Sequence, residues 1–234
     1  MTKLEKLLRE FEIEIDSEKN NKLEKYRELL LEWNSFMNLT AITEEDDVNI
    51  KHFLDSLTIF KTGELDGKKS VIDVGTGAGF PGIPMAIQNP DLEVTLLDSL
   101  NKRIKFLNKV VEETELGNVT TYHGRAEEFA RKKEFRDAFD VSVSRAVANM
   151  STLAEYTMPY VKPGGVMIAM KGSEYKEELK EAENAIKILG GEIKEVKEIT
   201  LPDGILHSLI VVEKVKPTPK KYPRAGDKPK SKPL

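Results

Sequence analysis

Three glycines follow a short apolar run in the first half of the chain, and this spacing is typical of a ligand site. Residues 71–74 contain two valines and an isoleucine, as a buried strand does, and Gly75, Gly77 and Gly79 come directly after them. Because glycine has no Cβ, it can adopt a positive φ and let a ligand approach the backbone closely. Ligands of open α/β sheets bind beyond the carboxyl ends of the strands, so the turn predicts a site for a nucleotide-sized molecule.

Two acidic residues stand at the ends of predicted strands, where such a ligand could use them. Asp73 comes two residues before Gly75, and Asp98 follows a second apolar run at residues 94–97. An acid about 20 residues after a glycine turn can accept both hydroxyls of a ribose. A carboxylate at the end of a buried strand loses its hydration unless it has a partner, so both acids favour a ligand site over a turn used only for packing.

Two classes of cofactor fit this turn. Gly77, Gly79 and Gly82 match the G-x-G-x-x-G pattern of dinucleotide-binding folds, which would make the protein an NAD-dependent dehydrogenase. The run from Asp73 to Gly79 instead resembles the first motif of class I S-adenosylmethionine-dependent methyltransferases, in which an acid before the glycines helps to hold the amino acid part of the donor. That resemblance implies S-adenosylmethionine as cofactor and S-adenosylhomocysteine as product. A hydride-transfer site is not evident in the sequence.

Other candidate residues follow later strands. Arg145, at the end of the strand predicted over 139–144, could contact a phosphate, a carboxylate or a guanine edge, or could pair with an acid of the fold. Lys171, after the strand predicted over 165–170, could face substrate or be solvated. In class I enzymes the positions of Ala126 and Glu127 contact adenine, although Glu127 could equally be favoured by a helix dipole. The three histidines lack ligand spacing and are predicted to be structural, with no metal site.

The residue types present restrict the methyl acceptor. Class I enzymes that methylate exocyclic amines of bases usually have an Asn/Asp-Pro-Pro-aromatic loop where this chain has Ser144-Arg145-Ala146. Methylation of a pyrimidine carbon commonly needs a cysteine nucleophile, and the chain contains no cysteine. Ring nitrogen and oxygen acceptors remain. Guanine N7 carries a free lone pair and needs no proton removed, so we expect positioning and electrostatics to suffice, without a catalytic dyad.

Composition separates a basic C-terminus from an acidic body. The formal charge of the 234 residues is −4, but residues 214–234 contain eight basic residues and one acid, so their charge is +7 and that of the rest is −11. A basic tail on an acidic body favours an anionic partner such as phosphate. No apolar run approaches the roughly 18 residues that span a bilayer, and no signal-peptide core is present, so we expect a cytoplasmic protein without membrane contact.

The predicted secondary structure that would position these residues changes along the chain, from helices alone to strands that alternate with helices. Residues 3–62 have helical spacing with an apolar stripe, and Ser17 is a plausible cap. Strands near 70–74, 93–97, 119–123, 139–144 and 165–170 alternate with helices, and a hairpin near 192–214 predicts two antiparallel strands at the end. We therefore expect an α/β class I, Rossmann-like fold with a mainly parallel sheet and one antiparallel strand near its end. The predicted parts are a helical cap (1–66), a methyltransferase domain (67–215) and a tail (216–234) that is disordered unless bound.

Most of the chain is similar to the bacterial small-subunit ribosomal RNA methyltransferase G family, also called glucose-inhibited division protein B. The resemblance rests on Trp33-Asn34, Asn38-Leu39-Thr40, His52-Phe-Leu-Asp55-Ser56, the run from Asp73 to Pro84, Leu97-Asp98-Ser99 with Lys102-Arg103, Ser144-Arg145-Ala146 and Tyr222-Pro223-Arg224.

The resemblance implies N7 methylation of one guanine in a conserved loop of 16S rRNA, free or within the small subunit. It also implies donor contacts at Gly75, Phe80, Ala126, Glu127 and Arg145. We expect Lys220, Lys221 and Arg224 to bind RNA, although an unstructured solubilising end is the alternative, and Ala225-Gly226 depart from the basic residue or proline usual after that arginine. A monomer is favoured. A non-catalytic RNA-binding module with a vestigial donor pocket stays open as a further alternative.

Overall fold

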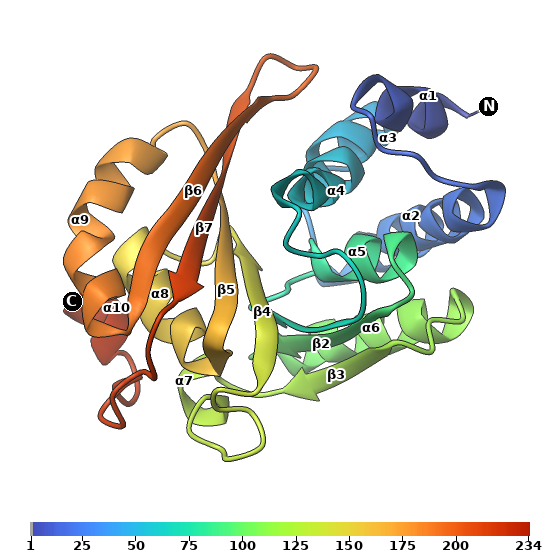
Figure 1. The fold of residues 1–234 in the computed structure, drawn as a ribbon. Coiled ribbons are helices and arrows are strands. Elements are labelled where there is room, and N and C mark those ends of the chain that lie inside the picture. The colour runs from blue at the N-terminus through green and yellow to red at the C-terminus, as the bar shows by residue number, and fades with distance from the viewer. Residues whose placement is uncertain (1) are drawn as a thin grey trace.

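A seven-stranded sheet forms the centre of the protein in the computed structural model, which describes residues 2–234 (Figure 1). Its strand order is β3-β2-β1-β4-β5-β7-β6, and every neighbouring pair from β3 to β5 is parallel. Strand β7 runs antiparallel to both β5 and β6, which confirms the predicted hairpin. The strands are β1 (Lys69–Val74), β2 (Leu92–Asp98), β3 (Val119–His123), β4 (Phe139–Arg145), β5 (Val161–Lys171), β6 (Gly191–Thr200) and β7 (Leu206–Lys214). The class I architecture expected from the sequence is therefore present.

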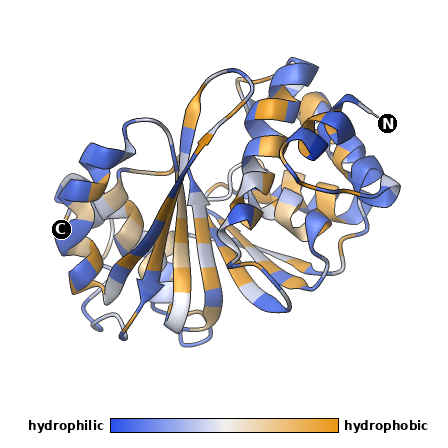
Figure 2. Cartoon of the chain, turned by 45° about the horizontal axis from the view of Figure 1, so that its top comes forward, coloured by the Kyte–Doolittle hydropathy of each residue, from blue (hydrophilic) through white to orange (hydrophobic). Residues whose placement is uncertain are grey.

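Helices cover both faces of this sheet (Figure 1). On one side lie α8 (Met150–Thr157) and α9 (Tyr175–Ile188), and on the other lie α2 (Ser17–Met37), α5 (Gly82–Gln88) and α6 (Asn101–Glu113). Hydrophobic residues concentrate along the central strands, and hydrophilic residues are frequent on the outer helices (Figure 2). Within residues 2–234, no helix combines the length and the apolar character needed to cross a membrane. The helices that follow the strands are α5 (Gly82–Gln88), α6 (Asn101–Glu113), α7 (Ala126–Phe129), α8 (Met150–Thr157), η3 (Met158–Tyr160), α9 (Tyr175–Ile188) and α10 (Lys228–Ser231).

Residues 2–62 form a cap of helices against α5 and α6. Its long helix α2 begins one residue after Asp16, whose carboxylate accepts the backbone N–H of Lys19 at 2.8 Å, so Asp16 and not Ser17 is the cap. The apolar stripe predicted on this helix is confirmed, since Leu23 and Leu30 are buried. The elements of the cap are α1 (Lys3–Glu10), α2 (Ser17–Met37), α3 (Glu45–Val48), η1 (Asn49–Leu54), α4 (Asp55–Leu57) and η2 (Thr58–Thr62).

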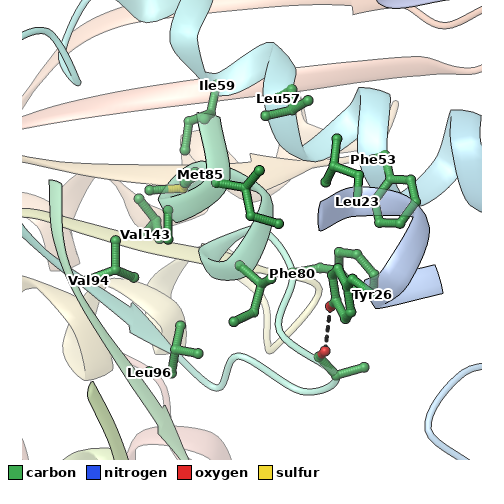
Figure 3. Packing of buried hydrophobic residues seen from close by; sticks show 14 of the residues in the cluster. Leu23, Tyr26, Phe53, Leu57, Ile59, Phe80, Met85, Val94, Leu96 and Val143 are labelled. Carbon is green, nitrogen blue, oxygen red and sulfur yellow. Dashed lines mark hydrogen bonds between the residues drawn. The ribbon is translucent and has the colours of Figure 1, made fainter. Parts of the chain in front are cut away.

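Tyr26 links this cap to the glycine turn by a hydrogen bond and by aromatic packing (Figure 3). Its buried hydroxyl donates to the carbonyl oxygen of Ala78 at 2.5 Å, and its ring stacks on Phe80 with centroids 5.2 Å apart. Phe53, from η1, packs against both rings. The cap therefore contributes a direct hydrogen bond to the backbone that was predicted to face a ligand.

We expect Tyr26→Phe to loosen the turn while leaving the aromatic packing in place. The carbonyl of Ala78 would lose a buried partner, which costs about 1–3 kcal/mol. Urea unfolding should show a loss of that size, and calorimetric titration should show weaker binding of S-adenosylhomocysteine, the product that the sequence resemblance implies. Tyr122→Phe, a half-exposed tyrosine on β3, is the matched control. Unchanged stability and affinity in Tyr26→Phe would mean that the hydrogen bond does not hold the turn.

The C-terminal segment is ordered against the domain, and the prediction of a tail disordered unless bound is wrong. Tyr222 is buried in the apolar cluster beneath α8 and α9. Arg136 donates to the carbonyl oxygens of Thr218 at 2.8 Å and of Tyr222 at 2.9 Å. Arg224 donates to both carboxylate oxygens of the buried Glu155, at 2.9 and 2.6 Å. Backbone carbonyls and these two side chains thus anchor a segment whose composition alone suggested disorder.

Candidate active site

The glycine turn lies between the ends of β1 and β2. Gly75, Gly77 and Gly79 all have positive φ, at 73°, 65° and 107°, as predicted. Gly75 donates its backbone N–H to the carbonyl of Leu97 at 2.8 Å. A Cβ added at Gly77 would meet no protein atom within 4 Å, and Gly77 lines a cavity, so its bare backbone borders open space. Gly79 lies deeper, against Tyr26 and the helices.

Asp73 stabilises the glycine turn through hydrogen bonds on its buried side. Its side chain is fully buried, and its Oδ2 accepts the hydroxyl of Thr76 at 2.7 Å and the backbone N–H of Gly82 at 2.9 Å. A Cβ at Gly82 would lie 2.8 Å from that oxygen, so only glycine fits there. Burial raises the pKa of Asp73 to about 7. Asp73 lines neither of the cavities at the turn, and its other carboxylate oxygen, Oδ1, is buried without a hydrogen-bond partner among the described residues, so its contact with a donor stays a prediction.

Asp98, in contrast, borders both cavities at the turn. Its Oδ2 accepts the backbone N–H of Gly77 at 2.9 Å and Nη1 of Arg103 at 3.2 Å, and its Oδ1 accepts the backbone N–H of Leu100 at 2.9 Å. A carboxylate offers about four acceptor positions. One is therefore open, and the long bond from Arg103 is the one that a ligand hydroxyl could replace.

Two adjoining cavities lie along this turn. The inner cavity, about 200 Å³, is bordered by Ala126, Glu127 and Tyr156, and the central cavity, about 360 Å³, by Gly77, Phe80 and Arg145. Both are also bordered by Gly75, Asp98, Ser99 and Val147. Small-molecule sites typically measure about 300–1,000 Å³, so the pair is large enough for one elongated ligand.

Glu127 is held in the wall of the inner cavity. Arg125 donates to its carboxylate at 2.5 Å, and the same guanidinium reaches Asp227 of the C-terminal segment at 2.8 Å. Both bonds raise the pKa of Arg125 above its ordinary value. The C-terminal segment therefore supports the wall that was predicted to contact adenine.

Arg145 lies between the central cavity and a third one, which we call the hairpin cavity because Ile205 and His207 of the β6–β7 hairpin border it. Its Nη1 donates to Asp55 Oδ2 at 2.8 Å and to the carbonyl of Lys51 at 3.0 Å. Its guanidinium also lies 5.0 Å from the ring centroid of Phe80. The structure shows the predicted pairing with an acid of the fold, and that acid, Asp55, fixes the guanidinium at a cavity wall. Contact of Arg145 with a ligand stays a prediction.

The structure brings His52 and His207 to this arginine, which sequence reasoning missed. His52 stacks on Phe80 with centroids 4.4 Å apart, and its Nδ1 lies 3.2 Å from Arg145 Nη2. Nδ1 of His207 lies 2.6 Å from Asp55 Oδ1. Asp55 could have indicated this cluster from the sequence alone, because an acid inside the apolar helical stretch that contains Phe53 needs a buried partner. Within residues 2–234, no group of three or more His, Asp or Glu side chains is arranged to hold a metal ion.

Lys171 is not solvated, so that interpretation is wrong. Its side chain is largely buried, and its Nζ lies 2.6 Å from Glu178 Oε2 and donates to the carbonyl of Ala148 at 2.7 Å. It borders the hairpin cavity and does not border the inner cavity.

His52 gives the stability of the protein a predicted dependence on pH. Burial, together with the charge of Arg145, lowers the pKa of His52 to about 4. Below pH 6.5, His52 is protonated in the unfolded chain but stays neutral in the folded chain until the pH nears 4. The free energy of unfolding therefore decreases as the pH falls from 6.5 towards 4. At about 1.4 kcal/mol per pH unit, the loss between pH 7 and 5 is on the order of 2 kcal/mol.

Urea unfolding of the wild type and of His52→Gln at pH 7 and 5 measures this contribution. Asp73 acts in the opposite direction, because its raised pKa lets the folded state keep a proton that the unfolded state releases above 3.8. Since Asp73 is present in both proteins, the difference between them isolates His52. An equal loss in both proteins would show that His52 is already protonated in the folded state at pH 5.

The sheet order with its antiparallel β7, the glycine turn and the strand-end acid define a class I S-adenosylmethionine-dependent methyltransferase fold. Solved structures agree on the fold. TrmN from Thermus thermophilus aligns with a TM-score of 0.54 at 16% identity over 68% of this chain and 48% of that chain. TYW2 from M. jannaschii in complex with AdoMet aligns with a TM-score of 0.52 at 15% identity, over 68% of this chain and 76% of that chain.

The chain belongs to the family described as GidB, rRNA small subunit methyltransferase G, whose model matches residues 19–206. It is 53% identical to the ribosomal RNA small subunit methyltransferase G of Lachnoclostridium phytofermentans over 97% of this chain and 94% of that protein. The ribosomal RNA small subunit methyltransferase G of Alkaliphilus oremlandii is 52% identical over 95% of this chain and 93% of that protein. The resemblance read from the sequence is thereby confirmed, and the dehydrogenase alternative is excluded.

Proposed function

We propose that this protein transfers a methyl group from S-adenosylmethionine to N7 of one guanine in 16S rRNA. The observation that carries the proposal is the meeting of the central and hairpin cavities at Arg145 and Ala146. One cavity lies on the glycine turn, and the other is separate from it, so a donor and an acceptor can approach each other at that junction. Family membership supports ribosomal RNA as the acceptor.

We propose that the donor occupies the inner and central cavities together. In this proposal Asp98 binds the ribose hydroxyls, Ala126 and Glu127 border the adenine, and Gly75, Gly77, Phe80 and Arg145 surround the amino acid part and the sulfonium. Asp73 and Gly79 act indirectly by holding the turn in shape. Bound S-adenosylmethionine supplies an electrophilic methyl group on a positively charged sulfur.

The residues of the chain then have little covalent chemistry to do. The lone pair of N7 lies in the plane of the base and is available at neutral pH, so no general base is required. What the protein supplies is orientation and exclusion of water, which can contribute several orders of magnitude to the rate. Arg145 stands at the cavity junction and Lys171 in the wall of the hairpin cavity, and we propose that both position the substrate.

The deciding experiment maps the methylated nucleotide. Unmodified 16S rRNA and small subunits lacking the modification are each incubated with the protein and labelled S-adenosylmethionine, and the product is digested and analysed by mass spectrometry. We expect a single 7-methylguanosine. Label in an exocyclic amine or on a pyrimidine would overturn the proposal, and binding of RNA without any transfer would favour a non-catalytic module.

The basic C-terminus is proposed to contact RNA through its exposed lysines. Lys220 and Lys221 are exposed, whereas Arg224 is engaged by Glu155, so the two lysines are the better candidates for phosphate contacts. We expect Lys220→Ser/Lys221→Ser to lower the slope of log affinity against log salt by about 1.4 on single-stranded RNA, because each contact contributes about 0.7.

Filter binding across a salt series measures that slope. Truncation is a poorer test, because it would leave Glu155 buried without its arginine. Lys133→Ser/Glu134→Ser, which removes no net charge, is the control. An unchanged slope in the lysine variant would place the RNA contacts on the rest of the domain. With this substrate, we expect a monomer acting in the cytoplasm, and analytical ultracentrifugation tests the oligomeric state.

A further inference from the structure

The hairpin cavity has the size and lining of a pocket for a flat ring. Its volume is about 430 Å³, and Ile42, Met170 and Ile205 provide apolar walls. It also contains Arg145, which it shares with the central cavity, and His207. In Figure 1 the β6–β7 hairpin that carries Ile205 and His207 extends beyond the end of the sheet. A ring in this cavity would therefore lie between β5, the cap and the hairpin, directly beside the donor site.

Most charged groups around the cavity already have partners. Lys171 pairs with Glu178 at 2.6 Å, and Lys51 pairs with Asp47 at 2.9 Å. His207 differs from them. Its Nδ1 faces Asp55, but within the described residues its Nε2 has no hydrogen-bond partner, and 27% of its side chain is exposed. Nε2 of His207 is thus a polar atom at the cavity wall that is available to a ligand.

Asp55 fixes the orientation of that imidazole. The carboxylate is 2% exposed and is shared, with Oδ1 facing His207 Nδ1 at 2.6 Å and Oδ2 accepting from Arg145 at 2.8 Å. An ionised carboxylate only accepts hydrogen bonds, so Nδ1 of His207 carries a proton. The antiparallel pairing of β7 with β5 places His207 beside the end of β5, where Ser208 pairs with Lys171.

We propose that the hairpin cavity takes an unpaired guanine turned out of the RNA, and that Nε2–H of His207 donates a hydrogen bond to its O6. The proposal rests on the proposed function and names the group that selects the base. O6 is adjacent to N7 on the guanine ring, and His207 is adjacent to Arg145 through Asp55. A base held at O6 by His207 can therefore turn its N7 edge towards the donor, and the proposal requires this orientation. Adenine has an amino group in place of O6, so two donors would face each other.

Because Nδ1 of His207 already carries a proton, Nε2 can donate only when the imidazole is doubly protonated, and the surroundings of His207 favour that form. The hydrogen bond to Asp55 is the main cause that raises its pKa, and Asp203 in the hairpin loop acts in the same direction. Burial and the charge of Arg145 act against them. Bases in unpaired loops can be turned out at a cost of only a few kcal/mol, and apolar walls accept their faces.

The test compares His207→Leu and His207→Gln with the wild type on two substrates. One is 16S rRNA with guanosine at the target position, and the other carries 2-aminopurine riboside there, which keeps N7 but lacks O6. We expect His207→Leu to lower kcat/KM on the guanosine substrate about 10- to 100-fold, as for the loss of a hydrogen bond to a charged donor. His207→Gln should recover part of it, because its amide can donate.

The second substrate makes the assignment specific. The wild type should lose a similar factor on 2-aminopurine, and His207→Leu should lose nothing further. If instead both proteins lose the same factor on 2-aminopurine, His207 does not contact O6. Affinity for S-adenosylhomocysteine should stay within about twofold in His207→Leu, because a fall in parallel with activity would mean that His207 acts through Arg145. Thr200→Asn, an exposed position on β6, is the control. Absence of transfer by the wild type on the guanosine substrate would overturn the proposed function itself.

Discussion

Arg145→Ala is expected to lower kcat/KM for methyl transfer by about 10²- to 10³-fold, the range seen when one positioned donor at a reacting centre is removed. The guanidinium stands where the two cavities meet, held by Asp55, the carbonyl of Lys51 and the face of Phe80. Loss of the side chain would open the wall between donor and acceptor and release the base from a fixed position. Single-turnover transfer of labelled methyl to 16S rRNA measures the effect.

Arg145→Ala also leaves Asp55 buried with only His207 as a charged partner. Breaking a buried pair in this way costs about 3–5 kcal/mol, so part of the protein could be unfolded in the assay. Arg145→Lys separates the two effects, because it keeps a charge near Asp55 but lacks the planar fork. Arg9→Ala, an exposed arginine on α1, is the matched control. Wild-type activity in a folded Arg145→Lys would show that charge alone, and not the guanidinium geometry, matters.

Asp98→Ala is expected to weaken binding of S-adenosylhomocysteine about 10- to 100-fold. A ribose hydroxyl donating to an ionised acceptor contributes about 1.5–3 kcal/mol, and each 1.4 kcal/mol is tenfold in affinity. The substitution also removes the acceptor for the N–H groups of Gly77 and Leu100, which fix the glycine turn against β2. Isothermal titration calorimetry measures the affinity directly and does not depend on RNA.

Asp98→Asn sharpens this test, because its amide keeps the shape of the side chain but places a donor where the carboxylate accepts from Gly77 or Leu100. We expect it to bind the product nearly as poorly as Asp98→Ala. Glu93→Ala, an exposed position on the same strand, should bind normally. Product affinity unchanged by Asp98→Ala would refute the assignment of the ribose acceptor.

The sequence by itself determined the sheet, the glycine turn and the family. These depend on local rules, since β-branched runs favour strands, and only glycines tolerate the positive φ of this turn. The position of Asp98 one strand away from the turn also follows from the regular spacing of β-α-β units. Periodicity further identified the apolar stripe of α2, because its buried face repeats every turn of the helix.

Only the tertiary structure decided which polar groups meet. Asp55 and His207 are 152 residues apart, and they come together because β7 inserts antiparallel beside β5 and the cap folds over the same edge. The side on which Asp73 lies, and the anchoring of the C-terminus by Arg136 and Glu155, likewise depend on partners distant in sequence. A buried charge is stable only where a specific partner offsets its lost hydration, and the identity of that partner is a property of the packed molecule, not of the local sequence.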